Sequence, residues 1–353
     1  RVQYLAYREL ATAVKSHRAK SGSLVMLDIR TGEVMAMVGQ PSYNPNNRKG
    51  LKSQYLRNRA VTDVFEPGST MKPFTIAAGL QSGNYKPNSL INTSPGYYQI
   101  GEYMVRDMHN YGEIDVSTII TKSSNVGASK IALSLEPEQY WDTLSRFGFG
   151  QSTDSGYPGE SSGSLNSFNT WSEIEMATLS FGYGLSVTPL QLVHAYSVLA
   201  TGGVMLPVSF VKVNGSVMGK RVMPENITRQ VRKMLETVVS ANGTGKRAAI
   251  KGYRVIGKTG TVHKSIRGGY SDDRYLSVFA GIAPASEPRF AMVVLIDEPN
   301  GDEHYGGVVA APVFSKVMEG TLRILNIPPD DLSTFTSPVI AHRKKSDQPQ
   351  GFD

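Results

Sequence analysis

Apolar residues along the chain recur at two spacings, which separate the expected strands from the expected helices. Alternating or continuous apolar runs bounded by glycine, proline or polar turn residues are typical of strands. Such runs occur near both ends of the sequence, at 23–29, 34–38, 253–261, 275–283 and 289–297. The short polar turn between the first two runs predicts a hairpin. The sequence therefore predicts a sheet that is assembled from both ends of the chain.

Helical spacing dominates the middle of the sequence. Apolar residues three and four positions apart share one face of a helix, and they recur at 70–81, 116–122, 126–135, 189–199 and 224–239. Further helices are predicted near the N-terminus and over 309–325, where the helix would pack on the sheet. The fold class predicted is α/β, with a central, mostly antiparallel sheet flanked by helices and an inserted helical lobe.

The folded domain is expected to cover residues 1–330. Residues 331–353 are polar, contain Pro, Lys and Asp, and show no period, so they are predicted to form a disordered tail. The Ser- and Gly-rich stretch 151–169 is expected to be a loop within the domain.

Composition narrows the classes of function. The net charge of +7 comes from 37 basic and 30 acidic residues without a long run of either sign, which gives little support to nucleic-acid binding. The chain contains no cysteine, so thiol nucleophiles, thiolate metal sites and disulfides are excluded. The longest apolar run, Phe290–Ile296, is far shorter than a membrane span.

Two sequence patterns match well-known catalytic motifs in an unsuitable context. The stretch from Gly252 to Thr259 fits a phosphate loop, but its centre is bulky and no helix follows, so the anion would meet no helix N-terminus. The stretch Gly159-Glu-Ser161-Ser-Gly163 fits a nucleophile elbow, but neither a strand nor a helix flanks it. Both are interpreted as structural segments, and no cofactor or metal site is predicted.

The pattern S-x-x-K occurs at Ser69–Lys72 and at Ser209–Lys212. The second pair lies in an alternating segment predicted as a strand, in which residues three apart point to opposite faces. Pro73 restricts the first pair to the first turn of a helix, where residues three apart share a face. A serine hydroxyl needs an adjacent base to act as a nucleophile, and a neutral Lys72 could accept the proton of Ser69.

Two weaker patterns complete the candidate site. Among several S-x-N matches, only Ser123-Ser-Asn125 lies between two helical segments, where a tight turn would project both polar groups one way; a helix-capping turn is the alternative. The pattern K-[ST]-G occurs at Lys20 and at Lys258-Thr259-Gly260. In the second, Thr259 and Thr261 would share one face of a strand, and Gly260 would let another backbone approach. An exposed edge of that strand could hold an extended peptide.

Taken in order, these three motifs resemble the set found in penicillin-binding proteins and serine β-lactamases. The surrounding sequence is similar to class B, septum-building peptidoglycan D,D-transpeptidases from the N-terminus to about residue 330. The segments that carry this resemblance are Ser42-Tyr-Asn-Pro-Asn-Asn47, Arg57-Asn-Arg-Ala60, Asp63-Val-Phe-Glu-Pro-Gly-Ser69, Ser180-Phe-Gly-Tyr-Gly-Leu-Ser186, Tyr305-Gly-Gly307 and Ala311-Pro-Val-Phe314.

The resemblance implies a role for each site residue. Ser69 would attack the penultimate D-alanine of a stem peptide with Lys72 as base, and Ser123 would pass the proton to the leaving D-alanine. Asn125 would bind the substrate amide, and the charge of Lys258 would help to keep Lys72 neutral. Substrate contacts are further implied for Thr259, Gly260 and Thr261, and backbone N–H groups of Ser69 and Thr261 would form the oxyanion hole. The same resemblance places Tyr183, His304 and Tyr305 on the cleft wall, although ordinary packing would also explain these three residues.

The resemblance also implies partners and a location. Stem peptides and their lipid-linked precursors would be substrates, and β-lactams would be inhibitors. Expected partners are a membrane glycosyltransferase and other division proteins at the periplasmic face of the inner membrane, and nucleic acid is not expected. Family members carry a membrane anchor and a noncatalytic domain before this domain, so the chain is expected to be part of a longer protein. The motifs leave open a D,D-carboxypeptidase, a β-lactamase or a penicillin-binding sensor domain.

Overall fold

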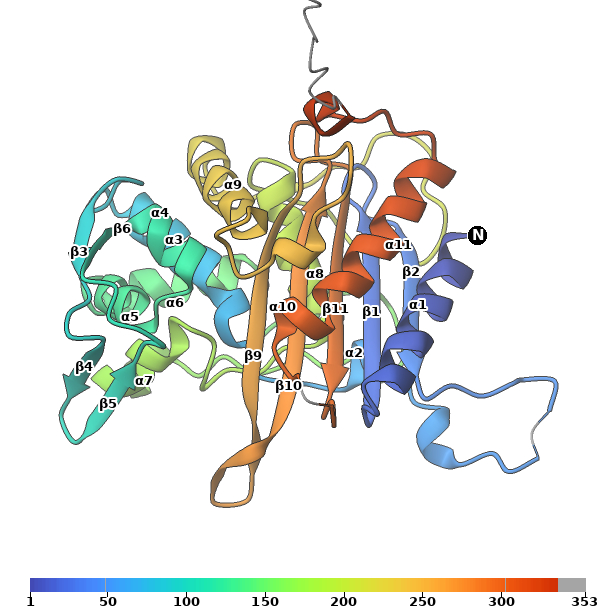
Figure 1. Ribbon diagram of the computed structural model, residues 1–353, viewed down its shortest axis with the longest axis horizontal. Coiled ribbons are helices and arrows are strands. Elements are labelled where there is room, and N and C mark those ends of the chain that lie inside the picture. The colour runs from blue at the N-terminus through green and yellow to red at the C-terminus, as the bar shows by residue number, and fades with distance from the viewer. Residues whose placement is uncertain (48, 302, 336–353) are drawn as a thin grey trace, which may run out of the picture.

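A five-stranded antiparallel sheet forms the centre of the computed structural model, which describes residues 1–47, 49–301 and 303–335 (Figure 1). Its strands lie in the order β2-β1-β11-β10-β9. They span Val34–Gln40, Ser21–Asp28, Phe290–Asp297, Gly269–Ala283 and Ile256–Ile266. Strands from the two ends of the chain therefore lie side by side, as predicted, and the hairpin β1–β2 is confirmed.

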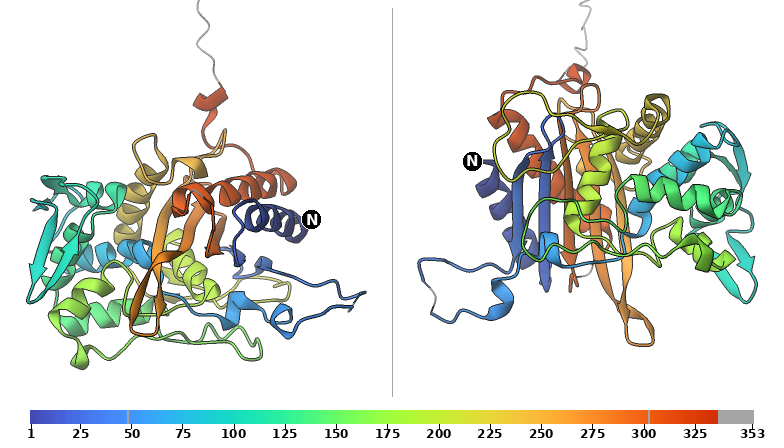
Figure 2. Two further views of the ribbon diagram at one scale, coloured as in Figure 1. Left: turned by 60° about the horizontal axis from the view of Figure 1, so that its bottom comes forward. Right: turned by 180° about the vertical axis from the view of Figure 1, so that it is seen from behind.

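Helices cover both faces of this sheet (Figure 2). Helices α1 (Val2–Ser16) and α11 (Ala311–Ile324) pack on one face, and α8 (Pro189–Ala200) packs on the other. All eight residues of β1 are buried because alternate side chains enter different cores. Leu24 packs with the α1 and α11 residues, whereas Val25 packs with those of α8. Such continuous burial explains the unbroken apolar run from Leu24 to Leu27 within β1.

The inserted lobe is mostly helical and adjoins the β9 edge of the sheet (Figure 1). Phe74 of α3 joins the lobe to α8, since edge-on contacts bring its ring centroid to 4.9–5.4 Å from those of Phe147, Phe149 and Tyr196. The lobe helices are α3 (Lys72–Gln81), α4 (Val116–Lys122), α5 (Asn125–Leu133), α6 (Pro137–Arg146) and α7 (Glu173–Leu179), and α9 (Glu225–Val239) packs between α3, α4 and β9.

Short elements complete the described chain. Small two-stranded sheets pair β3 with β6, β4 with β5 and β7 with β8. These strands span Leu90–Asn92, Glu113–Asp115, Tyr97–Ile100, Tyr103–Arg106, Val204–Met205 and Lys220–Arg221. The remaining helical turns are α2 (Arg59–Thr62), α10 (Gly306–Val309) and the 3-10 turns η1 (Ser53–Tyr55), η2 (Gly68–Met71), η3 (Phe168–Thr170), η4 (Lys246–Ala248) and η5 (Leu332–Phe335).

Two sequence-based expectations change in the structure. The segment around Ser209 forms one isolated bridge to Glu33 instead of the predicted strand, because the Ser209 hydroxyl donates locally to the Val211 carbonyl. Of the predicted disordered tail 331–353, the first residues form η5, in which the Thr334 hydroxyl accepts a bond from the Gly252 N–H. Residues 336–353 lie outside the described part of the chain.

A close contact between Gly68 and Gly182 holds the η2 turn against the loop between α7 and α8. The Gly68 N–H donates to the Gly182 carbonyl at 3.1 Å, and both residues have positive φ. A Cβ atom on Gly182 would lie 2.1 Å from the Gly68 carbonyl oxygen. By contrast, a Cβ atom on Gly184, which also has positive φ, would meet nothing closer than 3.9 Å. The turn therefore depends on Gly182 for space and not only for backbone freedom.

Alanine substitutions at these two glycines should separate the two effects. Gly184→Ala should lower the free energy of unfolding by about 1 kcal/mol, the cost of a left-handed alanine. Gly182→Ala should lower it by about 3 kcal/mol or more, since the backbone of η2 must also move. Urea denaturation of both variants measures the difference. Equal losses would show that Gly182 supplies only backbone freedom.

Candidate active site

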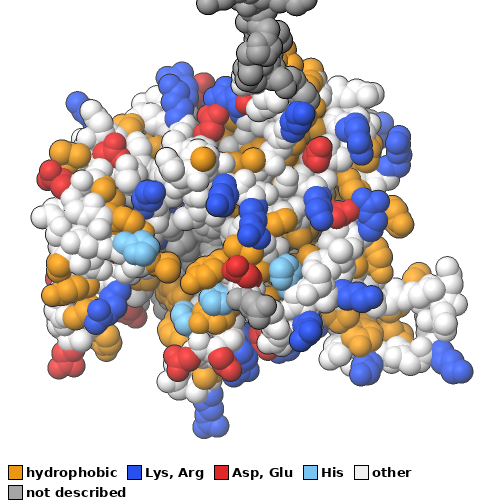
Figure 3. Space-filling model, in the orientation of Figure 1, with side chains coloured by type: hydrophobic (Ala, Val, Ile, Leu, Met, Phe, Trp, Pro, Cys, Tyr) orange, Lys and Arg blue, Asp and Glu red, His pale blue; other side chains and the backbone are white. Residues whose placement is uncertain are grey.

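Three distant segments of the chain meet where the helical lobe adjoins β9, and the surface is hollowed on this side of the molecule (Figure 3). The first segment is η2, which carries Ser69 and leads into α3 at Lys72. The second is the turn between α4 and α5, which carries Ser123 and Asn125. The third is β9, which contributes Lys258. The structure thus brings together the four residues of the predicted S-x-x-K and S-x-N motifs and the lysine of the K-T-G motif.

Lys72 lies at the centre of the cluster, and its side chain is fully buried. Its Nζ atom is 2.6 Å from the Ser123 carbonyl oxygen and 2.7 Å from the Asn125 Oδ1 atom, two groups that can only accept. These two oxygens match the two N–H bonds of a neutral amine. Its lone pair is then left for a hydroxyl, and the Ser69 Oγ atom lies 2.9 Å away. The arrangement allows Ser69 to donate its proton to Lys72.

Burial and like charge favour the neutral form of this lysine. Burial lowers the pKa of Lys72 well below its ordinary value, and the charge of Lys258 lowers it further, while Asp107 acts in the opposite direction. Burial also lowers the pKa of Lys258, to about 7. The amines of Lys72 and Lys258 would both be charged in water, but in the folded protein they are not both fully protonated near neutral pH.

Ser123 bridges the two lysines through its hydroxyl. Its Oγ atom lies 3.0 Å from the Lys72 Nζ atom and 2.9 Å from the Lys258 Nζ atom. Ser123 ends α4 in the left-handed conformation, with φ 62° and ψ 39°. This backbone costs a non-glycine residue about 1 kcal/mol or more, and it aims both the carbonyl and the hydroxyl of Ser123 at Lys72. The predicted tight turn is confirmed, and the turn also caps the next helix as in the alternative interpretation, because the Ser124 hydroxyl accepts a bond from the Gly127 N–H.

Asp107 holds this turn in place, although the sequence did not single it out. Its carboxylate accepts bonds from the Ser124 hydroxyl at 2.6 Å and from the backbone N–H groups of Asn125 and Val126. It therefore caps the N-terminus of α5, where the helix dipole favours a negative charge. A single aspartate eighteen residues before Asn125 shows no local pattern, so only the fold reveals the contact.

Strand β9 is the outermost strand of the sheet, and the η2 turn lies against Gly260. A Cβ atom at Gly260 would lie 3.1 Å from both the Pro67 carbonyl oxygen and the Thr70 Cγ2 atom. This confirms that glycine there permits a close backbone approach. The Thr259 Oγ1 atom is 2.8 Å from that of Thr244, and the Thr261 Oγ1 atom accepts from the Gly306 N–H.

The three predicted wall residues flank β9 just beyond Thr261. The Tyr183 hydroxyl accepts a bond from the His263 N–H at 3.3 Å. The His304 ring stacks on that of Tyr275 with a centroid distance of 3.9 Å, and it lies 4.5 Å from the Tyr305 ring. These contacts place the residues beside the predicted site, and their contact with substrate stays a prediction.

Comparison with known proteins assigns the family. The family described as the penicillin-binding protein transpeptidase domain matches residues 22–319. The chain belongs to this family. It is 49% identical over 334 residues to the peptidoglycan D,D-transpeptidase FtsI of Escherichia coli K12, covering 95% of this chain and 56% of that protein. The chain thus spans little more than half the length of that relative.

Other members of the transpeptidase family agree in sequence and in structure. The probable peptidoglycan D,D-transpeptidase PenA of Neisseria flavescens is 47% identical over 339 residues, which cover 96% of this chain and 84% of that protein. The apo transpeptidase domain of Burkholderia pseudomallei penicillin-binding protein 3 superposes with a TM-score of 0.86 at 41% identity, covering 93% of this chain and 96% of that chain. The predicted resemblance to a class B transpeptidase domain is confirmed.

The competing sequence patterns have structural explanations in this transpeptidase domain. Gly257, Lys258 and Thr259 belong to a continuous strand and not to a loop before a helix, so the rejection of a phosphate loop is confirmed. The Ser161 N–H donates to the Val61 carbonyl within an irregular segment. The Ser21 hydroxyl of the first K-S-G pattern donates to Asp297 at the start of β1. Each of these serines has a structural partner.

Two features are absent from the described part of the domain. No helix in the described ranges is both long and apolar enough to cross a membrane. No group of three or more His, Cys, Asp or Glu side chains in the same ranges is arranged to hold a metal ion.

The lowered pKa of Lys258 predicts how stability changes with pH. Between about pH 7 and the unfolded pKa of about 10.4, the unfolded chain holds a proton on this lysine that the folded chain has lost. Raising the pH through this window therefore favours the folded state. The free energy of unfolding of the wild type, relative to Lys258→Met, should rise from pH 7 to pH 9. Urea denaturation at several pH values measures it, and a flat or falling difference would contradict the lowered pKa.

Proposed function

We propose that the chain is a serine acyltransferase that cross-links peptidoglycan stem peptides by D-Ala-D-Ala transpeptidation and is acylated at the same serine by β-lactams. One observation carries the proposal: the buried Lys72 amine lies 2.9 Å from the Ser69 hydroxyl, in surroundings that favour its neutral form. Such an amine can act as the base that a serine nucleophile requires. The relatives named peptidoglycan D,D-transpeptidases support the reaction type.

In the acylation step, Ser69 gives its proton to Lys72 while its Oγ atom attacks the carbonyl carbon of the penultimate D-alanine. The backbone N–H groups of Ser69 and Thr261 are proposed to stabilise the oxyanion that develops. This role is supported by the close approach of η2 to β9 at Gly260. As the tetrahedral state collapses, the D-Ala–D-Ala amide bond breaks and an ester to Ser69 remains.

The leaving D-alanine needs a proton on its nitrogen, and Ser123 is placed to deliver it. Its hydroxyl lies within hydrogen-bonding distance of both lysine amines, so the proton that Lys72 took from Ser69 can pass through Ser123 to the leaving amine. In the second step the amine of an acceptor peptide attacks the ester, a new amide bond forms, and Ser69 regains a proton. The products are a cross-linked peptide and free enzyme.

Strand β9 is proposed to bind the donor peptide as an additional strand. Its outer edge lies beside the catalytic cluster, and strand addition lets backbone bonds hold an extended peptide. The hydroxyls of Thr259 and Thr261 would bind the terminal carboxylate, and Asn125 would bind the preceding amide. Tyr183, His304 and Tyr305 would form the wall around the donor.

The biological setting follows from the names of the relatives. The FtsI and PenA relatives support a role in the septal peptidoglycan synthesis of cell division. Lipid-linked precursors would feed the reaction, and a membrane glycosyltransferase and other division proteins are the proposed partners. The proposed location is the periplasmic face of the inner membrane.

Labelling by a fluorescent penicillin tests the identity of the nucleophile. Ser69→Ala should abolish covalent labelling, because no other hydroxyl is placed to take its position beside Lys72 in the described cluster except that of Ser123, which already bridges two lysines. The matched control Ser161→Ala removes a serine hydroxyl from an irregular loop and should label like the wild type. Labelling that survives in Ser69→Ala would overturn the assignment.

The role of Lys72 as base predicts a loss of acylation without a loss of fold. Lys72→Arg keeps the positive charge and roughly the reach, but a guanidinium does not release its proton in proteins. The second-order rate of penicillin acylation should therefore fall by about a hundredfold or more. Rates are measured across pH, with circular dichroism as the folding control. A near wild-type rate would mean that another group is the base.

A further inference from the structure

Glu66 lies three residues before Ser69 and connects three segments around the site. One carboxylate oxygen, Oε1, accepts a bond from the Gly184 N–H at 2.9 Å and another from the Tyr270 hydroxyl at 3.0 Å. Gly184 belongs to the loop between α7 and α8, and Tyr270 belongs to the hairpin of β9 and β10. The same oxygen therefore joins the segment leading to Ser69 to both of these segments.

The bond between Glu66 and Gly184 is one of several that attach the segment before Ser69 to the loop between α7 and α8. Phe65 and Val187 exchange two backbone bonds of 2.9 Å, and the Gly68 N–H donates to the Gly182 carbonyl at 3.1 Å. On this side the segment before Ser69 is held along its length by the backbone. The contact of Glu66 with Tyr270 is different, because it reaches a segment that the sheet does not fully support.

The outer end of the β9–β10 hairpin extends beyond its neighbours in the sheet (Figure 1). Strand β11 pairs with β10 only between Leu276 and Ala283, and the pairing of β10 with β9 is irregular between Tyr270 and Tyr275. The Tyr183 ring meets the Tyr270 ring edge-on, with centroids 5.2 Å apart. At this end β9 and β10 pair with each other, but side-chain contacts take the place of pairing with the rest of the sheet.

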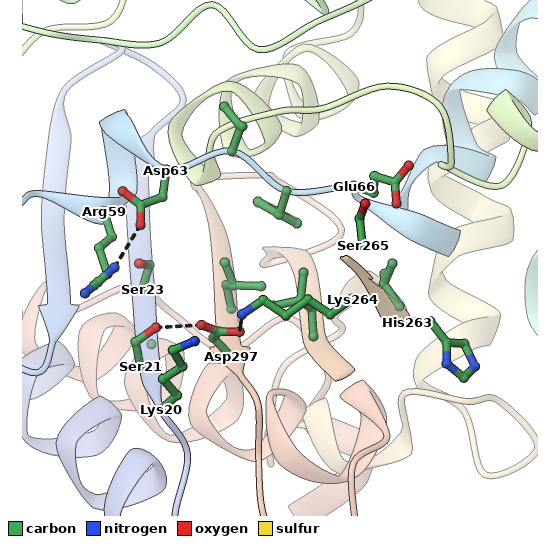
Figure 4. Close-up of a pocket in the computed structure, with 16 residues that line it drawn as sticks. Lys20, Ser21, Ser23, Arg59, Asp63, Glu66, His263, Lys264, Ser265 and Asp297 are labelled. Carbon is green, nitrogen blue, oxygen red and sulfur yellow. Dashed lines mark hydrogen bonds and ion pairs between the residues drawn. The ribbon is translucent and has the colours of Figure 1, made fainter. Parts of the chain in front are cut away.

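A cavity of about 320 Å³ lies next to Glu66, which bonds to Tyr270. It is lined by residues of the segment before Ser69, including Asp63 and Glu66, and by β9 residues on its other side. Figure 4 shows Glu66, Ser265 and His263 at one end of it, while Arg59, Asp63, Lys20 and Asp297 lie at the other. Val262 of β9 packs on Gly68. Beyond Val262 the cavity separates the two segments, so close packing does not hold this outer part of β9 against the segment that carries Ser69.

The second carboxylate oxygen, Oε2, is buried and has no hydrogen-bond partner among the described residues. Burying such an oxygen lowers stability, and burial accordingly raises the pKa of Glu66. Stability alone would thus not favour a carboxylate at this position. The bonds of Oε1 to a backbone amide and to a tyrosine hydroxyl are charge-assisted and therefore strong, which suits a role in holding segments at a fixed separation.

We propose that Glu66 is a positioning residue: it ties the outer end of the β9–β10 hairpin to the segment carrying Ser69 and so sets the separation between the nucleophile and the substrate-binding edge of β9. The inference rests on the proposed function, because that separation matters only if β9 holds the acyl donor. A nucleophile displaced by about 1 Å can lose a hundredfold in rate, so a partial loosening of the hairpin should be measurable.

Four single variants and the double variant Glu66→Ala/Tyr270→Phe separate this role from a general effect on folding. Tyr270→Phe removes the hydroxyl and keeps the ring against Tyr183, and Glu66→Ala removes the acceptor. Glu66→Gln keeps an oxygen for both donors. Tyr253→Phe is the matched control, since its hydroxyl donates to the Ile327 carbonyl away from the site. The limiting rate of acylation at saturating penicillin and the half-saturating concentration are measured for each, with thermal unfolding as the folding control.

Tyr270→Phe and Glu66→Ala should each lower the limiting acylation rate by about tenfold, and the double variant should fall no further than Glu66→Ala. Glu66→Gln should retain most of the rate, and Tyr253→Phe all of it. A wild-type limiting rate in Tyr270→Phe, or losses that multiply in the double variant, would overturn the inference.

Hydrogen exchange tests the tie without any acylation. In Tyr270→Phe the backbone amides of residues 264–270 should exchange faster than in the wild type, while those of β1 stay unchanged. Unchanged exchange at the hairpin end would overturn the tie. If the wild-type chain were not acylated at all, the proposed function would fail, and the exchange comparison would still decide whether Glu66 holds the hairpin.

Discussion

Two lysine amines buried side by side form the constraint on which the site depends. Lys72 and Lys258 are fully buried, and transferring even one ammonium group from water into a protein interior is costly unless it is paired or loses its proton. Within the described cluster their nearest partners are hydroxyls and carbonyls, not carboxylates. The fold therefore penalises full protonation of the pair, and the same penalty turns Lys72 into a base. Burial of the two lysines therefore both lowers the stability of the fold and makes Lys72 able to act as a base.

The surrounding backbone serves to bring this pair to Ser69. Gly68 and Gly182 allow the η2 turn to lie against the loop between α7 and α8, and Gly260 allows η2 to approach β9. On the opposite side, Ser123 adopts a left-handed conformation that directs its carbonyl and hydroxyl to Lys72, and Asp107 fixes the adjoining helix start. The left-handed backbone of Ser123 lowers local stability, a feature typical of preorganised sites.

Features set by local pattern could be predicted from the sequence, whereas features set by distant partners could not. The apolar runs of β1 and β11 and the helix at α3 follow directly from their spacing, and the serine–lysine spacing brings Ser69 to Lys72 even though Ser69 lies in a 3-10 turn. The contacts of Asp107, Glu66 and Thr244 join residues far apart in the chain, and a single polar residue has no period. The predicted strand at Ser209 was wrong because a local hydroxyl bond overrides the alternation.

The role of Lys72 as a base depends on its protonation state, which lysine-selective carbon and nitrogen NMR measures directly. Protein labelled at lysine would be titrated in the absence of substrate, with the Lys72 signal assigned by its loss in Lys72→Met. The Lys72 amine is expected to be neutral at pH 7, with a titration midpoint well below those of the exposed lysines. A Lys72 signal that stays charged up to pH 9 would rule out Lys72 as the base, because the amine could not then take the proton from Ser69.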